Sequence, residues 1–278
     1  HIYSRLFKYN AGAGVKRSDL LPVGDLAEAS EASPDGLTWT IKLRKDAKFH
    51  NVAPVNGRPL TTEDVKFSWG RAIAEANPNR TQLAFVDRVE YPDTSTVKFT
   101  LKAPNAAFLD VLADANLLWI MPTESDGKFN PAQQAIGSGP WMLDSYQSNV
   151  AIRYKKNPEW FVKGFPLMDA VESAIIPEYA TRLAQFQAGN TDVSAITAED
   201  VIAVKKGMPN INVYGEVSQL ANFLYFDPDP ASPWAKDPRI KQAVSMATDR
   251  ESLMDLADNV TKLKSEGLDV SDRGNNVI

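Results

Sequence analysis

The sequence predicts a mixed α/β fold, and three observations lead to it. Short segments such as residues 37–43 and 97–101 alternate apolar and polar residues, which is typical of strands with one buried face. Apolar residues also recur at helical spacing behind polar capping residues, as in residues 62–76. The two kinds of segment succeed one another without internal repeats. A chain of 278 residues, 44% of them hydrophobic, is long enough for about two domains.

The first regular stretch runs from Asp35 to Trp69. At its start, Pro34-Asp35-Gly36 predicts a tight turn, because Pro fixes one φ angle and Gly accepts a positive one. The alternation of residues 37–43 then predicts a strand that buries the faces of Leu37, Trp39, Ile41 and Leu43.

A helix is predicted after the basic loop that follows this strand. Thr61 and Thr62 can cap it, and Glu63 and Asp64 lie in its first turn, where the positive end of a helix favours carboxylates. Its expected buried face consists of Val65, Trp69, Ala72, Ile73 and Ala76.

A second pair of alternating strands is predicted at residues 86–91 and 97–101, with Asp93-Thr94-Ser95 as the turn between them. Asn105 is expected to cap a short helix that presents Phe108, Leu109 and Leu112. Residues 122–139 are rich in Pro, Gly, Ser and Asn, so they predict a crossing between subdomains.

The second half of the chain predicts a strand pair within residues 141–154, a strand that ends at Ile176, and a helix after Pro177 that Gly189 ends. Residues 220–226 are apolar and aromatic and precede Asp227-Pro228-Asp229-Pro230, which predicts a buried strand leading into a connector. Two further helices are predicted to start at Asp237-Pro238 and at Asp249.

Four motifs follow the Asp35–Trp69 stretch in a fixed order. They are Gly137-Ser138-Gly139-Pro140-Trp141, Asn157-Pro158-Glu159-Trp160, Phe186-Gln187-Ala188-Gly189-Asn190-Thr191-Asp192, and the run from Asp237-Pro238-Arg239-Ile240-Lys241-Gln242-Ala243 to Asp249-Arg250-Glu251. With these motifs the chain resembles the family 5 extracellular solute-binding proteins, which capture oligopeptides, dipeptides, nickel chelates and similar solutes for ABC importers. The chain departs from the family pattern in its longer loop between His50 and Pro59, and at Pro238, where Val is common.

The resemblance implies a type II periplasmic-binding-protein fold with the architecture of the oligopeptide-binding proteins, incomplete in this chain. Residues 1–17 would open the first lobe, residues 18–135 would form a small mixed β/α subdomain, residues 136–229 would continue the first lobe, and residues 230–278 would form the connector and the start of a truncated second lobe. The family's N-terminal strand and most of its second lobe are therefore expected to be missing, together with the strands on which the helix after Asp237 would pack.

The resemblance also implies a function. The family takes peptides or related small solutes into a cleft between its lobes and delivers them to a membrane permease. We therefore expect a monomeric, exported protein, periplasmic or at the cell surface, free or lipid-anchored, with a signal segment absent from this chain. No catalytic residue, metal or cofactor is implied. A solute sensor or interaction module of the same fold, not coupled to transport, is the alternative function.

Four residues are expected to face the ligand, because they lie where the family builds its cleft. They are Phe223, Tyr225, Asp227 and Trp234. Residues 220–227 would supply a hinge strand and residues 230–233 the connector. For the aromatic side chains, local packing is the alternative. For Asp227 and Asp229, a rigid connector is favoured over a calcium site, because the ligand spacing and central Gly of a calcium loop are missing.

Composition argues against other classes of protein. The net charge of −5 does not suit a nucleic-acid binder, and the absence of cysteine excludes disulfides and thiolate sites. No apolar run approaches the roughly 20 residues needed to span a bilayer. Gly137-Ser138-Gly139 suggests a hydrolase only superficially, because a nucleophile elbow needs Gly two residues on each side of Ser. His1 and His50 are too far apart in sequence to suggest a motif.

Overall fold

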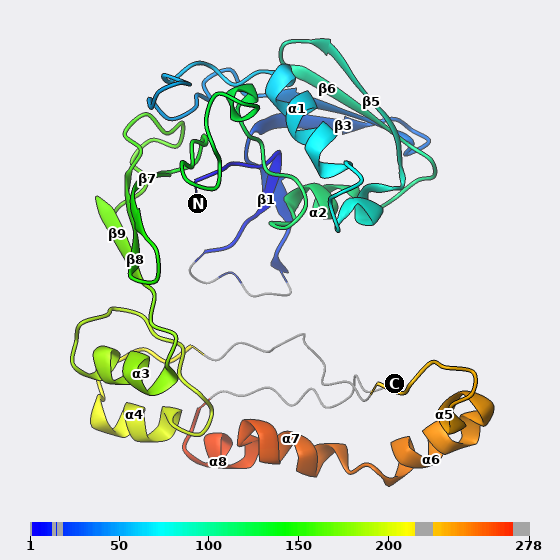
Figure 1. The fold of residues 1–278 in the computed structure, drawn as a ribbon, viewed down its shortest axis with the longest axis vertical. Helices are drawn as coiled ribbons and strands as arrows, with labels where there is room; N and C mark the ends of the chain where they lie inside the picture. The colour runs from blue at the N-terminus through cyan, green and yellow to red at the C-terminus, as the bar shows by residue number, and fades with distance from the viewer. Residues whose placement is uncertain (1, 13–14, 16–18, 215–224, 269–278) are drawn as a thin grey trace. The chain divides into compact units, whose positions relative to one another are not determined.

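The computed structural model describes residues 2–12, 15, 19–214 and 225–268, and the chain divides into two compact units, His1–Ile175 and Ile176–Ile278 (Figure 1). The first unit contains the strands. They are β1 (Phe7–Tyr9), β2 (Pro22–Gly24), β3 (Ala27–Ala32), β4 (Thr38–Leu43), β5 (Val86–Asp93), β6 (Thr96–Leu101), β7 (Trp141–Gln147), β8 (Ala151–Lys156) and β9 (Ala170–Ala174).

The strands form three separate antiparallel sheets. β1 pairs with β2, a four-stranded sheet has the order β3-β4-β6-β5, and a three-stranded sheet has the order β7-β8-β9. β4 and β6 pair although α1, η2 and β5 lie between them in sequence; the other pairs join consecutive strands. The mixed α/β fold class predicted from the sequence is confirmed.

β4 is the predicted strand of residues 37–43, one residue shorter. Ile41 and Leu43 are buried while Lys42 is exposed, as the alternation predicts. The turn before the strand places Gly36 at a φ of +70°, a conformation that side chains with a Cβ rarely adopt. The Gly36 N–H donates to the Ser33 carbonyl at 2.8 Å, which closes the turn.

The predicted helix is α1 (Thr62–Ala72), with Thr61 at its N-cap. The Thr61 N–H donates to Asp64 Oδ2 at 3.0 Å, so the carboxylate of the first turn satisfies a backbone group at the start of the helix. Val65, Trp69 and Ala72 are buried as predicted. The predicted buried face extends too far, because it includes Ile73 and Ala76. The helix ends at Ala72, and Ile73 is 45% exposed.

The other predicted elements of the first unit are also present. β5 and β6 are joined through Asp93, whose Oδ1 accepts from the Ser95 N–H at 2.8 Å and whose Oδ2 accepts from Thr96 Oγ1 at 2.7 Å. The predicted cap at Asn105 is wrong, because α2 (Phe108–Ala113) has Ala107 at its N-cap; Asn105 Oδ1 accepts from the Ala107 N–H at 3.0 Å and so holds the turn before the helix. Short 3₁₀ turns lie at η2 (Arg80–Leu83) and η3 (Thr123–Ser125).

The core of the first unit is built where α1 and α2 meet the four-stranded sheet. Trp69 and Phe108 both contact Phe99, with ring centroids 5.4 and 5.3 Å apart in edge-on geometry. Leu6 and Ile136 belong to the same buried cluster. Residues assigned to the first lobe therefore share one core with residues 18–135. The subdomain boundaries predicted at 17/18, 135/136 and 229/230 remain predictions.

The second unit is described as helices only. They are α3 (Tyr179–Gln187), α4 (Val201–Gly207), α5 (Pro233–Lys236), α6 (Pro238–Ala247), α7 (Arg250–Asp258) and α8 (Val260–Ser265). The predicted starts of α6 and α7 are confirmed, because Asp237 Oδ1 accepts from the Arg239 N–H at 3.0 Å and Asp249 Oδ1 accepts from the Ser252 N–H at 3.1 Å. Gly189, at a φ of +75°, follows the end of α3 as predicted.

Little of the second unit is buried among the residues that the structure describes. Val201, Ile202 and Leu263 form a small buried cluster between α4 and α8. α3 and α6 bury no residue, and Leu256 of α7 is 82% exposed. Most of the predicted strand at residues 220–226 lies outside the described residues.

Candidate functional site

The predicted ligand-facing residues fall at the start of the described part of the connector. Phe223 lies outside the described residues. Tyr225 is 90% exposed, and Trp234 is half-buried at the start of α5, with its ring 5.2 Å from that of Phe226. The structure therefore brings Trp234 against Phe226, and Tyr225, Asp227 and Trp234 line neither the hollow at His50 nor the one at Arg44.

The connector itself is held by short local hydrogen bonds. Asp227 Oδ1 accepts from the Asp229 N–H at 3.0 Å, and Asp229 Oδ1 accepts from the Ala231 N–H at 2.8 Å. Ser232 Oγ accepts from the Trp234 N–H at 3.1 Å and caps α5. Both carboxylates thus hold the backbone of consecutive turns, which fits the rigid connector predicted for this segment.

A hollow of about 480 Å³ lies in the first unit, next to the glycine-rich crossing that precedes β7. Its walls come from the loop after β4, from residues 132–135 within the predicted crossing, and from β7. The lining residues are His50, Val52, Ala132, Gln133, Gln134, Ala135, Met142, Leu143, Asp144, Ser145 and Tyr146. Sequence reasoning did not identify this hollow, because His50 and Val52 lie about 80 residues before the other lining residues.

His50 forms the buried end of this hollow and is 1% exposed. Its Nδ1 accepts from the Gly137 N–H at 3.3 Å, so Nε2 must carry the proton that is donated to the Gly139 carbonyl at 3.1 Å. Burial lowers the pKa of His50 from 6.5 to about 4, and only the bond to Gly139 opposes the shift. The imidazole is therefore neutral at pH 7 and acts as a link between two loops.

Residues 136–140 also contact the N-terminal segment and the loop after β8. The Gly139 N–H donates to the Ile2 carbonyl at 2.7 Å, and Asn157 Nδ2 donates to the Gly139 carbonyl at 3.0 Å. A Cβ at Gly137 would lie 2.1 Å from the Ile2 carbonyl oxygen, so only glycine fits there. Two of the motifs singled out in the sequence, at residues 137–141 and 157–160, thus meet at one buried junction.

This junction does not have the geometry of a hydrolase site. Ser138 is fully buried, and its Oγ has no partner among the described residues. Both ring nitrogens of His50 are taken by backbone groups, so the imidazole cannot accept the Ser138 proton. Within the described residues, no three His, Asp or Glu side chains gather as a candidate metal site.

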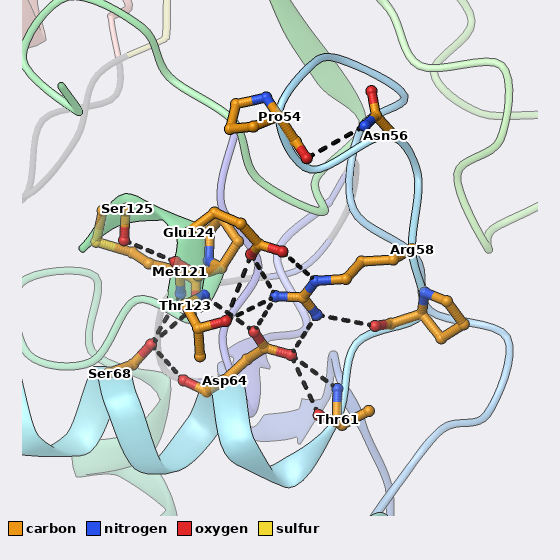
Figure 2. Close-up of polar contacts among 12 residues, drawn as sticks. Pro54, Asn56, Arg58, Thr61, Asp64, Ser68, Met121, Thr123, Glu124 and Ser125 are labelled. Carbon is orange, nitrogen blue, oxygen red and sulfur yellow. Dashed lines mark hydrogen bonds and ion pairs between the residues drawn. The ribbon is translucent and has the colours of Figure 1, made fainter. Parts of the chain in front are cut away.

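A second polar cluster was missed by sequence reasoning. Figure 2 shows the Arg58 guanidinium between two carboxylates: Nη2 lies 2.6 Å from Asp64 Oδ1 and 2.6 Å from Glu124 Oε2. Asp64 is fully buried, and it also accepts from the N–H groups of Thr61 and Thr123. The cluster ties the loop before α1 to the first turn of α1 and to η3.

The pKa values in this cluster follow from its geometry. The hydrogen bonds from Arg58 lower the pKa of Glu124 to about 2, and the bonds to Glu124 and Asp64 raise the pKa of Arg58. Thr61 and Asp64 could be recognised from sequence as a helix start. Glu124 could not, because it follows Arg58 by 66 residues and no local pattern connects them.

Comparison with known proteins identifies the family. A family model described as "Bacterial extracellular solute-binding proteins, family 5 Middle" matches residues 22–267. The probable D,D-dipeptide-binding periplasmic protein DdpA of Escherichia coli is 31% identical over 264 residues, which cover 91% of this chain and 48% of that protein. This chain thus spans about half the length of the curated relatives that it matches.

Solved structures show the same fold. AgaA from A. tumefaciens R10, in complex with agropinic acid, is 29% identical with a TM-score of 0.65, and the match covers 74% of this chain and 40% of that chain. DppA from Helicobacter pylori, in complex with the peptide STSA, has a TM-score of 0.77 at 23% identity, over 93% of this chain and 52% of that chain. No helix among the described residues has both the length and the apolar character needed to cross a membrane.

The fold is therefore of the type II periplasmic-binding-protein kind, with partial coverage of the larger architecture. The sequence motifs that suggested this resemblance lie inside the matched region, and two of them form the buried junction at His50. The chain belongs to the bacterial extracellular solute-binding proteins of family 5.

Proposed function

We propose that this chain is part of the extracytoplasmic solute-binding component of an ABC importer, which captures peptides or a related small solute and passes it to a membrane permease. The observation that carries the proposal is the family match over residues 22–267, together with a relative that is named as a D,D-dipeptide-binding periplasmic protein. The function is binding rather than catalysis, which agrees with the hydrogen-bonded state of both His50 nitrogens.

In this proposal the ligand contacts lie on the hinge strand of residues 220–227 and just after the connector of residues 230–233. Tyr225 and Trp234 offer aromatic surface, and Asp227 fixes the backbone between them through its bond to the Asp229 N–H. Peptide ligands would be held largely by backbone hydrogen bonds, with side chains in wet pockets. The protein works as a monomer in the periplasm or at the cell surface.

Calorimetry on the protein expressed from its complete reading frame tests ligand binding. A library of di- to pentapeptides should show binding in the micromolar range or tighter, which corresponds to about −8 kcal/mol. Tyr225→Ala should weaken that binding about tenfold or more if the ring contacts the ligand. Tyr214→Ala is the matched control, because Tyr214 is 89% exposed and Tyr225 is 90% exposed.

Two results would contradict the proposal. Absence of binding to any peptide, with the fold intact by circular dichroism, would exclude a peptide receptor. Equal effects of Tyr225→Ala and Tyr214→Ala would exclude the proposed contact at Tyr225. A deletion strain that takes up peptides at the normal rate, despite tight binding in vitro, would favour the sensor over the transport component.

A further inference from the structure

The junction at His50 has a property that the solute-binding role does not require. The side chain and the backbone of this one residue both hold the crossing of residues 136–140. The His50 N–H donates to the Gly137 carbonyl at 2.7 Å, and the imidazole bonds to Gly137 and Gly139. The same residue also lines the 480 Å³ hollow.

The hydrogen-bond pattern accepts only the neutral imidazole. Nδ1 faces an N–H donor, and Nε2 faces a carbonyl. A proton added to Nδ1 would place two donors against each other at 3.3 Å and would leave a charge in a site that is 1% exposed. Protonation therefore breaks the bond to Gly137 whatever happens to the rest of the junction.

Among the described residues, burial and the bond to Gly139 alone shift the pKa of His50, with no contribution from a charged group. Titratable groups near these residues in the sequence include Tyr3, Lys48, Arg58, Asp144, Tyr146 and Glu159. Lys48 pairs with Glu159 at 3.9 Å, and Asp144 pairs with Lys155 at 3.3 Å. Arg58 is held by Asp64 and Glu124, and none of these groups is hydrogen-bonded to the ring. Burial therefore disfavours the charged imidazolium of His50, and no nearby carboxylate in the described part of the chain offsets this effect.

The crossing is also held by contacts that do not titrate in this range. The Gly139 N–H donates to the Ile2 carbonyl, and Asn157 Nδ2 donates to the Gly139 carbonyl. Ile136 belongs to the buried cluster that contains Phe99, whereas Gly137 and Gly139, which the imidazole holds, lie outside that cluster. Loss of the imidazole bonds should therefore loosen the crossing locally, before the sheet unfolds.

We propose that His50 is an acid-sensitive latch: protonation of its imidazole releases residues 137–140 from the loop that carries His50 and widens the adjoining hollow, while the four-stranded sheet stays folded. The released segment leads directly into β7, whose residues also line the hollow. The proposal rests on the junction and holds whether or not the chain binds peptides.

Hydrogen exchange across a pH series tests the latch. Protection factors, which are corrected for intrinsic exchange rates, should fall for the amides of Gly137 and Gly139 by about tenfold per pH unit below 6.5, and level off near pH 4. Amides of β4 should keep their protection over the same range. Parallel loss of protection in β4 would mean global unfolding and would overturn the proposal.

His50→Gln is the decisive variant. The Gln amide offers one acceptor and one donor, as the neutral imidazole does, and it does not titrate. In His50→Gln the protection of Gly137 and Gly139 should become independent of pH between 6.5 and 4. A drop of the same size as in the wild type would assign the effect to other groups and overturn the proposal.

A measurement on the wild-type protein tests the proposal even if His50→Gln does not fold. The chain has two histidines, so the imidazole signals of His50 can be separated from those of His1 by magnetic resonance. His50 should titrate far below 6.5, and the Gly137 amide signal should shift with the same midpoint. Titration of His50 near 6.5 with an unmoved Gly137 signal would refute the latch.

Discussion

The two units of the chain start their helices with the same local signals but differ in how much side chain they bury. α1 begins with Thr61 and Asp64 and buries Val65 and Trp69 against a sheet. α6 begins with Asp237 ahead of Pro238, a capping geometry at least as regular, and buries no residue within the described part of the chain. Caps and turn residues therefore fix where a helix starts, whereas burial depends on partners from distant parts of the sequence.

Ion pairs show the same contrast. Arg58 holds Asp64 at 2.6 Å in the first unit, where the carboxylate is fully buried. Arg239 holds Asp237 at 2.7 Å in the second unit, where the Arg239 side chain is 84% exposed. The N···O distances of the two pairs are nearly equal, whereas their burial differs. A comparison of their contributions to the free energy of unfolding therefore tests how burial affects the strength of an ion pair.

Removal of a core ring should produce the largest effect. Phe99→Ala deletes a fully buried side chain between Trp69 and Phe108 and leaves a cavity, so we expect a loss of about 3–5 kcal/mol in the free energy of unfolding of the first unit. Leu256→Ala, at a position that is 82% exposed, should change stability by less than about 0.5 kcal/mol. Urea titration that gives equal losses for both variants would erase the contrast between the units.

Disruption of the buried pair comes next. Arg58→Leu leaves the Asp64 carboxylate buried without a cationic partner, held only by two backbone N–H groups and the Thr61 hydroxyl, so we expect a loss of about 3 kcal/mol in the unfolding free energy of the first unit. Arg239→Leu removes an equally close pair in the second unit and should leave the urea midpoint unchanged. A clear loss of stability in Arg239→Leu would show that exposure does not decide the strength of these pairs.

The pH dependence of the first unit should show a separate contribution from Glu124. Its pKa is lowered to about 2 from 4.5, so the contribution is fully present above 4.5 and is lost as the pH falls towards 2. Glu124→Gln should flatten this part of the stability profile, measured by urea midpoints at a series of pH values. Asp249→Asn, in the second unit, is the control and should leave the profile of the first unit as it is. An unchanged slope in Glu124→Gln would assign acid sensitivity to other carboxylates.

Much of the fold could be predicted from the sequence, because its signals are local. The turn at Gly36, the alternation of β4 and the caps at Asp237 and Asp249 each depend on a few neighbouring residues. The end of α1 was predicted too late, since Ile73 and Ala76 continue the apolar spacing although the helix stops at Ala72. Spacing alone does not show where burial ends.

The junction at His50 and the Arg58 cluster could not be predicted in the same way. His50 meets Gly137 and Gly139 across 87 and 89 residues, and Arg58 meets Glu124 across 66. The glycine motif was recognised from sequence as a family element, but its physical reason, the lack of room for a Cβ against Ile2, is a property of the folded chain. Of the predicted ligand residues, Tyr225, Asp227 and Trp234 are in the described part of the connector, and their contact with a ligand stays a prediction.

The smallest expected effect concerns the cap of α7, and it tests how far local signals suffice where burial is slight. Asp249 accepts from the Ser252 N–H at 3.1 Å and from Ser252 Oγ at 2.7 Å, and these bonds lower the pKa of its carboxyl. Asp249→Ala should speed hydrogen exchange of the first amides of α7 about fivefold, because a helix with an exposed Leu253 face gains little from packing. Asp249→Ser, which keeps an acceptor, should restore most of the protection. If Asp249→Ala exchanges at the wild-type rate, then tertiary contacts rather than the cap hold the start of α7, and the two units would not differ in the way that their buried areas suggest.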